Sequence, residues 1–184
     1  IGSSFSGADL VAGSAFHNYW GKSDVLDEMH KQFPNKDLMF SEASIGKWNN
    51  GRVVSTRLVS DMNELSLGCV KRYCSSVMVW NFMLDRDMKP NLDGGCQTCY
   101  GAVDIDNSDY TTFAYNSFYY IIAHMSSVAR AGAVRIATND YSQTGLDYCA
   151  FRNTDGTTSI VLDNSSASSM TVPVTDGTYS MTVS

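Results

Sequence analysis

Five side chains of types that act on sugars follow one another at the predicted carboxyl ends of apolar segments. Glu42 ends one such segment, His17 and Tyr19 lie in an earlier aromatic one, and Trp80 and Asn81 end a later one. In parallel sheets and barrels, functional side chains gather at the carboxyl ends of strands. A carboxylate can transfer a glycosyl group, aromatic rings pack on sugar rings, and histidine and asparagine bind hydroxyl groups. The set therefore indicates a carbohydrate site.

Each of these residues also has a purely structural explanation. Glu42 could be a solvated charge at a strand end, Trp80 a core residue, and His17 a hydrogen-bonded interior histidine. His17 and Tyr19 are two residues apart, so on one strand they would share a face. His30 and His124 fall within helical patterns, which predicts structural or solvent-facing roles for them.

Alternating strand and helix patterns over residues 15–131 would position these side chains. The patterns predict strands at 15–20, 37–41 and 76–80 and helices that follow Ser23, span 54–65 and span 118–128, with a long loop from about 84 to 109. Ser23 is the predicted N-cap of the first helix. The near-continuous apolar run at 37–41 suits a strand buried on both faces. Such alternation implies parallel strands joined by right-handed crossovers.

The pattern changes after Gly132, where short strands alternate with turn signals. The predicted strands are 134–137, 147–151, 158–162, 170–172 and 179–183. Regular spacing of short strands is typical of a small antiparallel sandwich. We therefore expect an α/β region at 1–131 and an all-β domain at 132–184.

Three strand–helix units do not close a (β/α)8 barrel, which takes about 250 residues. Either the units form a small open sheet, or the first half of a barrel lies elsewhere. The chain begins at Ile1 rather than Met, which favours a processed or truncated chain.

Composition excludes several classes of function. Of 184 residues, 43% are hydrophobic and the net charge is −6, with no basic stripe, which argues against nucleic-acid binding. No apolar run approaches the roughly 18 residues of a membrane span, and residues 1–12 lack the pattern of a signal peptide. We expect no nucleic-acid partner and no transmembrane segment.

Cysteine spacing indicates a disulfide-permissive environment. Cys96 and Cys99 lie in a Gly-Gly-Cys-Gln-Thr-Cys stretch that could be a short disulfide, a redox pair or half a zinc site. A surface disulfide in a secreted protein is the preferred interpretation, because no second CxxC is present and the histidines are scattered. Asn164 begins an Asn-Ser-Ser glycosylation acceptor. The pairing of the other cysteines is left open: Cys69, Cys74 and Cys149.

Several segments, in collinear order, resemble glycoside hydrolase family 30, which includes glucosylceramidases and endo-β-1,6-glucanases. The resemblance covers nearly the whole chain and rests on residues 15–19, 33–44, 79–85, 94–99, 118–126, 132–136 and 150–156. It implies that 15–19, 33–44 and 79–85 belong to the sixth, seventh and eighth strands of a (β/α)8 barrel. The fold it implies is therefore the C-terminal part of such a barrel followed by a β-sandwich. The Gly-Gly-Cys-x-x-Cys loop leans toward the β-1,6-glucanases.

The resemblance also implies roles for the five side chains. Glu42 matches the nucleophile of a retaining glycosidase, and Tyr19 and His17 match residues beside it. Trp80 matches a tryptophan of the terminal-sugar pocket, with Asn81 next to it. The family's acid/base glutamate ends the fourth strand, which would lie upstream of Ile1 in an N-terminal half. The chemistry needs no metal or organic cofactor.

The match has departures. The three aspartates after the third strand, Asp85, Asp87 and Asp93, do not match the acid/base position. Asn18 stands where relatives often carry Cys or Trp. Arg130-Ala131 stands where relatives usually have an apolar residue and Pro, which alters the expected join between barrel and sandwich.

Three hypotheses follow. The first is one part of a retaining β-glycosidase, inactive alone, that acts on a β-glucan or a glucosyl lipid in a secreted or lysosome-like setting. The second is a non-catalytic scaffold or carbohydrate-binding component of an extracellular assembly, since fold does not fix function. The third, an independent α/β domain, would leave open sheet edges and has no phosphate-binding loop. A partner chain with a glutamate at its fourth strand end would favour the first over the second.

Overall fold

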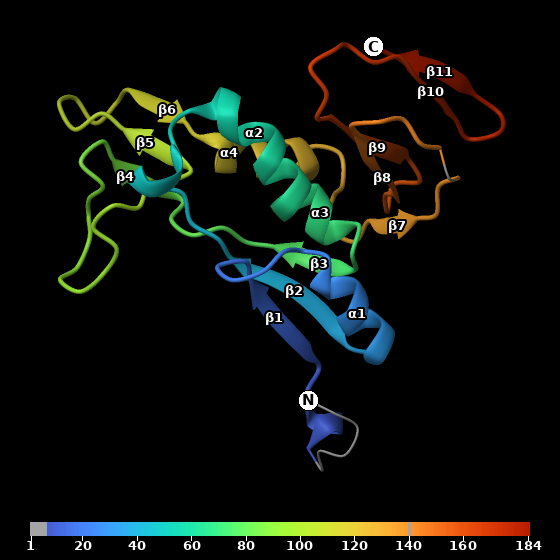
Figure 1. The fold of residues 1–184 in the computed structure, drawn as a ribbon, viewed down its shortest axis with the longest axis horizontal. Coiled ribbons are helices and arrows are strands. Elements are labelled where there is room, and N and C mark those ends of the chain that lie inside the picture. The colour runs from blue at the N-terminus through green and yellow to red at the C-terminus, as the bar shows by residue number, and fades with distance from the viewer. Residues whose placement is uncertain (1–6, 140) are drawn as a thin grey trace.

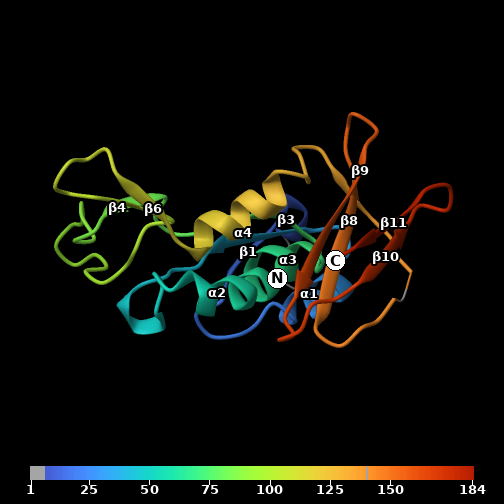
Figure 2. The ribbon, with the colours of Figure 1, turned by 90° about the horizontal axis from the view of Figure 1, so that it is seen from above.

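The computed structural model describes residues 7–139 and 141–184 (Figure 1). A parallel sheet and its helices form the middle of the molecule. A small sheet, β4–β6, lies at one end, and the strands β7–β11 lie at the other, as both views show (Figures 1 and 2). Two short 3-10 turns, η1 (Ala8–Leu10) and η2 (Lys47–Asn49), complete the set of elements.

The central sheet has the order β1-β2-β3, and all of its strands are parallel. The strands are β1 (Gly13–His17), β2 (Asp37–Glu42) and β3 (Cys74–Val77). The helix α1 (Val25–Gln32) connects the first two strands. A continuous helical segment connects the next two, and it runs through α2 (Val54–Asp61), a π-helical turn η3 (Met62–Ser66) and α3 (Leu67–Val70). The predicted strand–helix alternation is therefore confirmed.

The sequence of helix α1 has the charge distribution and the apolar positions that favour a helix packed on the core. Acidic residues occupy its first turn and basic residues its last, which suits the helix dipole. Leu26 is buried in the core, and Met29 packs against it one turn later. The predicted capping by Ser23 is wrong, because Asp24 takes the N-cap position without a side-chain cap. The Ser23 amide instead donates a hydrogen bond of 2.6 Å to Glu64 Oε1.

The segment predicted as one long loop after residue 84 contains regular structure. Strand β4 (Met83–Asp85) pairs in parallel with β5 (Val103–Ile105), which pairs antiparallel with β6 (Phe113–Tyr115). Each strand has three residues, too few for a hydrophobic period to register. Helix α4 (Ser117–Ser126) follows and packs on α2.

The C-terminal strands form two small antiparallel sheets. One has the order β7-β8-β9 and the other pairs β10 with β11. Their bounds are β7 (Val134–Ile136), β8 (Leu146–Arg152), β9 (Thr158–Asn164), β10 (Val172–Thr175) and β11 (Ser180–Val183). The β8–β9 pairing runs from Leu146↔Asn164 to Arg152↔Thr158 without a register shift. The five predicted strands are present; four lie within two residues of their expected bounds, and β10 ends three residues later than the predicted 170–172.

One hydrophobic core joins the two kinds of structure. It contains Leu26, Phe40 and Phe118 from the α/β region together with Phe151 and Val161 from β8 and β9. Burial of this apolar surface is the main favourable contribution to folding.

The predicted strand bounds and burial need correction at the central sheet. The first strand ends at His17 rather than at residue 20, and the third spans 74–77 rather than 76–80. Strand β2 is buried on one face only: Leu38 and Phe40 are 2% exposed, whereas Met39 between them is 37% exposed. The helices cover one face, and within the described residues the sheets stay open and form no closed barrel.

In the described part of the chain, every helix is too short or too polar to cross a membrane.

Candidate functional site

A shift in strand register sets the position of Glu42. Phe16 pairs with Phe40, but the next residue, His17, pairs with Glu42, so one residue of β2 is skipped. Side chains alternate between the faces of a strand, so an undisturbed β2 would turn Glu42 to the helix-covered face of Leu38 and Phe40. The irregularity, like a β-bulge, re-aims the side chain. Glu42 accordingly lies beside His17.

Glu42, Tyr19 and His17 lie together at the carboxyl ends of β1 and β2. The Tyr19 hydroxyl donates to Glu42 Oε1 over 2.8 Å and lies 2.9 Å from Ser44 Oγ. His17 Nδ1 lies 3.9 Å from the same Glu42 oxygen. The rings of His17 and Tyr19 meet edge to face with centroids 5.8 Å apart. The expected proximity of these two residues is therefore present, although Tyr19 lies in a turn after β1 and not on the strand.

The surroundings keep Tyr19 a hydrogen-bond donor. Burial raises the pKa of its phenol above 10.0, and the hydrogen bond to Glu42 and that carboxylate's charge add to the rise, while the contact with Ser44 opposes it. A protonated phenol can donate a charge-assisted hydrogen bond to a carboxylate, which fixes the orientation of the carboxylate.

Trp80 and Asn81 join this cluster through the backbone. The Trp80 amide donates to the carbonyl of Ala43, the residue after Glu42, over 2.8 Å. Trp80 is 46% exposed, so part of the residue is accessible to a ligand. Asn81 has a φ of 60°, a left-handed conformation that asparagine tolerates better than most residues. Its carbonyl accepts from the Ala102 amide over 2.9 Å, which ties it to the sheet β4–β6.

The arrangement has the components of a sugar site. It combines an oriented carboxylate, a phenol and an imidazole on one side with an exposed indole on a neighbouring strand extension. A carboxylate held in this way can attack an anomeric carbon or accept hydrogen bonds from sugar hydroxyls. In the described residues there is no group of three or more His, Cys, Asp or Glu side chains that could hold a metal ion.

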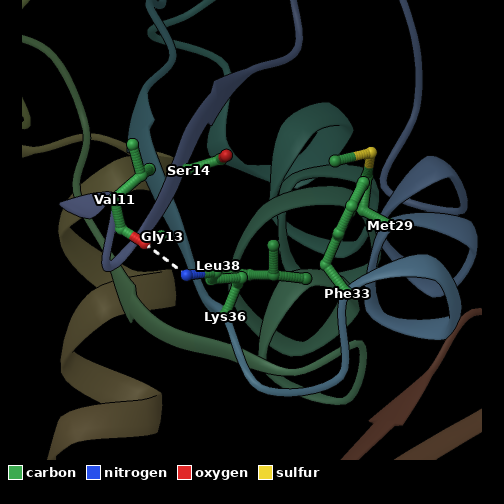
Figure 3. Close-up of a pocket in the computed structure, with 7 residues that line it drawn as sticks. All are labelled: Val11, Gly13, Ser14, Met29, Phe33, Lys36 and Leu38. Atoms are coloured by element: carbon green, nitrogen blue, oxygen red, sulfur yellow. Dashed lines mark hydrogen bonds between the residues drawn. The ribbon is translucent and has the colours of Figure 1, made fainter. Parts of the chain in front are cut away.

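A cavity at the other end of the same strands is distinct from this cluster. It has a volume of about 30 Å³ and is enclosed by Val11, Gly13, Ser14, Met29, Phe33, Lys36 and Leu38 (Figure 3). The Lys36 ammonium reaches the Val11 carbonyl beside it over 2.7 Å. Gly13 and Leu38 lie near the amino ends of β1 and β2, so the cavity and Glu42 lie at opposite ends of these strands.

The cysteines divide into a surface pair and a buried set. Cys96 and Cys99 form the expected disulfide, and Cys69, Cys74 and Cys149 are free and buried. Asn164 is exposed at the end of β9, where its side-chain oxygen accepts from the Ser166 amide and hydroxyl.

Sequence reasoning missed Ser44, which lies within hydrogen-bonding distance of Tyr19. Its place two residues after Glu42, at the end of an apolar strand, was the available signal. Arg52 and Asp104 were also missed; they pair across 52 residues of sequence, which no local pattern reveals.

The parallel sheet with a carboxylate at its carboxyl edge and the antiparallel strands behind it are the parts expected of a glycoside hydrolase. Residues 132–184 match the model of the glycosyl hydrolase family 30 β-sandwich domain. The resemblance of the sequence to family 30 is confirmed by this match and by the relatives described next.

The relatives are glucanases and glucosylceramidases. Endo-1,6-β-D-glucanase BGN16.3 of Trichoderma harzianum is 30% identical over 167 residues, 85% of this chain and 31% of its own length. Putative glucosylceramidase 4 of Caenorhabditis elegans is 27% identical over 171 residues, 85% of this chain and 31% of its own length. The solved structure of the endo-β1,6-glucanase BT3312 is 53% identical, with a TM-score of 0.91 over 94% of this chain and 38% of that one.

This chain spans about a third of the length of the curated relatives that it matches.

Proposed function

We propose that this chain supplies the nucleophile, Glu42, and part of the sugar-binding surface of a retaining β-glycosidase. In this proposal Glu42 attacks the anomeric carbon to form a glycosyl-enzyme, which water then hydrolyses. Tyr19 and His17 orient the carboxylate, Trp80 packs on the sugar ring, and Asn81 binds a hydroxyl group.

One observation carries the proposal: the hydrogen bond of 2.8 Å from Tyr19 to a carboxylate that the register shift turns toward His17. A solvated strand-end charge would need neither the shift nor the phenol. The similarity to glycoside hydrolases of family 30 supports the same conclusion.

The second carboxyl group comes from outside this segment in our proposal. Retaining glycosidases need an acid/base about 5–5.5 Å from the nucleophile. In the family that this chain resembles, that glutamate ends the fourth barrel strand, upstream of the strands that residues 15–85 resemble. On this ground we assign the acid/base glutamate to an N-terminal half, and expect this chain to be inactive alone.

The same N-terminal half would complete a (β/α)8 barrel over residues 1–131, with the sandwich at 132–184 as the second domain. Strands β1 and β3 are the outer strands of the central sheet, and the uncovered face of β2 carries the exposed Met39. A groove of about 610 Å³ also runs between β3 and α4. A sheet with open edges of this kind is stabilised when further strands close it.

The proposed substrate is a β-1,6-linked glucan. One similar protein of known structure is an endo-β1,6-glucanase with 53% identity, a closer likeness than that to putative glucosylceramidase 4. A glucosyl lipid is the second candidate, because putative glucosylceramidase 4 is also a relative. The surface disulfide and the exposed Asn164 acceptor support a secreted or lysosome-like location with a glycan on Asn164.

The test combines substrate choice with stereochemistry. The active assembly that contains this chain is incubated with β-1,6-glucan, β-1,3-glucan and glucosylceramide, and the anomer first released is identified by proton NMR. We expect release from β-1,6-glucan with the β-anomer first. Release of the α-anomer would contradict the retaining mechanism. Binding of glucan without hydrolysis would support the scaffold role instead.

A further inference from the structure

The loop that follows Glu42 is joined to the segment before β5 by a run of backbone hydrogen bonds. The Lys47 amide donates to Thr98 over 3.0 Å, and the Tyr100 amide donates to Ile45 over 2.8 Å. Between these bonds Gly46 and Cys99 form an antiparallel bridge. A Cβ at Gly46 would run into the Thr98 carbonyl and the Trp48 ring, so the backbones are in close contact there.

Arg52, further along the loop after Glu42, connects this loop to the β4–β5 region through its side chain. Its Nε donates to Asp104 Oδ2 over 2.6 Å and its Nη2 donates to the Arg86 carbonyl over 2.9 Å. Its guanidinium carbon also lies 4.0 Å from the centroid of the Tyr100 ring. One side chain thus contacts the end of β4, strand β5 and the segment between them. We call Arg52, Asp104 and Tyr100 the clamp.

The burial of Asp104 makes this contact specific. The residue is 4% exposed, and its Oδ1 is buried without a hydrogen-bond partner. A buried carboxylate is tolerated when a cation pairs with it, so the aspartate depends on Arg52. Lysine cannot present the same planar fork to a carboxylate, a carbonyl and a ring together.

We propose that the clamp positions Trp80 and Asn81 relative to Glu42. Glu42 ends β2 and opens the loop that Arg52 ends. The Asn81 carbonyl accepts a hydrogen bond from the amide of Ala102, which lies between Tyr100 and Asp104 in the sequence. The Trp80 amide donates a hydrogen bond to the carbonyl of Ala43, the residue after Glu42. Arg52 therefore fixes the two chain segments that carry the nucleophile and the sugar-packing indole. This inference rests on the proposed function of those two residues.

A purely structural role would give a different result from a positioning role. Loss of stability lowers the fraction of active molecules but leaves KM and the turnover of each active site unchanged. Loss of position changes KM and turnover at every site, because displacement of about 1 Å can cost on the order of 10²-fold.

The test compares Arg52→Met/Asp104→Asn with Arg130→Met in the active assembly. The double variant removes both charges, so no carboxylate is left buried and unpaired. Arg130 pairs with Asp155 at an exposed site in the sandwich region, and its variant is the matched control. Active sites are counted with a covalent inhibitor, and kcat and KM are measured on β-1,6-linked gluco-oligosaccharides. Affinity for the same oligosaccharide is measured by calorimetry in a Glu42→Gln background, where hydrolysis does not interfere.

We expect the double variant to lose about 10²-fold in kcat/KM per active site and to bind the oligosaccharide about tenfold more weakly, with the control unchanged. A kcat/KM per active site and an affinity within twofold of wild type would contradict the proposed positioning role of the clamp. Amide hydrogen exchange at Trp80 and Ala102 provides a readout that needs no activity, and we expect exchange to be faster in the double variant only. If the wild-type assembly is inactive, the proposed function fails; unchanged exchange would then also overturn the clamp, and faster exchange would support its positional role.

Discussion

The central sheet and the β8–β9 hairpin differ in the regularity of their strand pairing. The hairpin pairs seven residues of each strand in unbroken register. The central sheet shifts register in both of its strand pairings, between Phe16 and His17 and between Leu38 and Phe40. It also carries a left-handed asparagine, Asn81, just beyond its third strand. Irregular geometry of this kind concentrates where side chains must be aimed rather than merely packed.

The two regions should therefore respond differently to substitution. A change at the Glu42 cluster should remove activity and spare stability, and a change in the hairpin should do the reverse. Substitutions in each region, with activity and stability measured separately, test this division.

Removal of the proposed nucleophile should have the largest effect. Glu42→Gln in the active assembly is expected to lower kcat by on the order of 10⁴-fold or more, because no covalent intermediate can form. The melting temperature should change little, since Glu42 lies at the edge of the core. Glu28→Gln makes the same chemical change on helix α1 and should retain wild-type activity. A Glu42→Gln protein with more than a tenth of the wild-type kcat would contradict the claim that activity depends on the Glu42 cluster.

Truncation of Phe151 in the hairpin should be the largest loss of stability. Phe151 is 4% exposed and packs in the shared core, so Phe151→Ala should cost about 3–5 kcal/mol in the free energy of unfolding, measured by urea denaturation. Tyr179→Ala, at an exposed aromatic, should stay within about 0.5 kcal/mol. The surviving folded molecules should keep their turnover per inhibitor-labelled site. A large fall in that turnover would show that the sandwich shapes the site directly.

Loss of the Tyr19 hydroxyl should have an intermediate effect on activity. Tyr19→Phe keeps the ring but removes the hydrogen bond of 2.8 Å to Glu42. A hydrogen bond to a charged group contributes about 1.5–3 kcal/mol, so kcat/KM should fall by roughly 10- to 100-fold. A kcat/KM within twofold of wild type would exclude this role for the phenol.

The smallest effect concerns a mismatch in the hairpin itself. Asp163 pairs directly across from Asp147, and burial raises the pKa of the Asp163 carboxyl above 3.8, with the charge of Asp147 adding to the rise. Because the folded state favours the protonated form, stability is lost as the pH rises from 3.8, and the loss is complete above the folded-state pKa of Asp163. Asp163→Asn should therefore raise the melting temperature at neutral pH, and the gain should vanish below about pH 3.8. A gain independent of pH would mean that charge is not the cause.

The sequence predicted the elements that have a clear period or clear boundaries. The helices of the α/β region were predictable from a hydrophobic period over several turns, and the five C-terminal strands from the turn signals that separate them. Strands β4, β5 and β6 were not, because each has three residues and turn-forming aspartates flank them. Their existence depends on pairing with one another rather than on local preference.

The candidate site was predictable in type but not in geometry. The residue types at strand ends indicated Glu42, His17 and Tyr19, and the structure brings these together. The register shift that turns Glu42 toward His17 depends on backbone pairing across strands, which one sequence does not reveal. The same holds for Ser44 and for Arg52 with Asp104, whose contacts arise only after the chain has folded.

The identity of the nucleophile is tested most directly by intact and peptide mass spectrometry after treatment with an epoxide inhibitor of retaining β-glucosidases. The native assembly is labelled, digested and sequenced, with the Glu42→Gln assembly as the control. We predict one covalent label per active site, located on Glu42, and none in the control. A label on another carboxylate, or an active assembly that takes no label, would contradict the account.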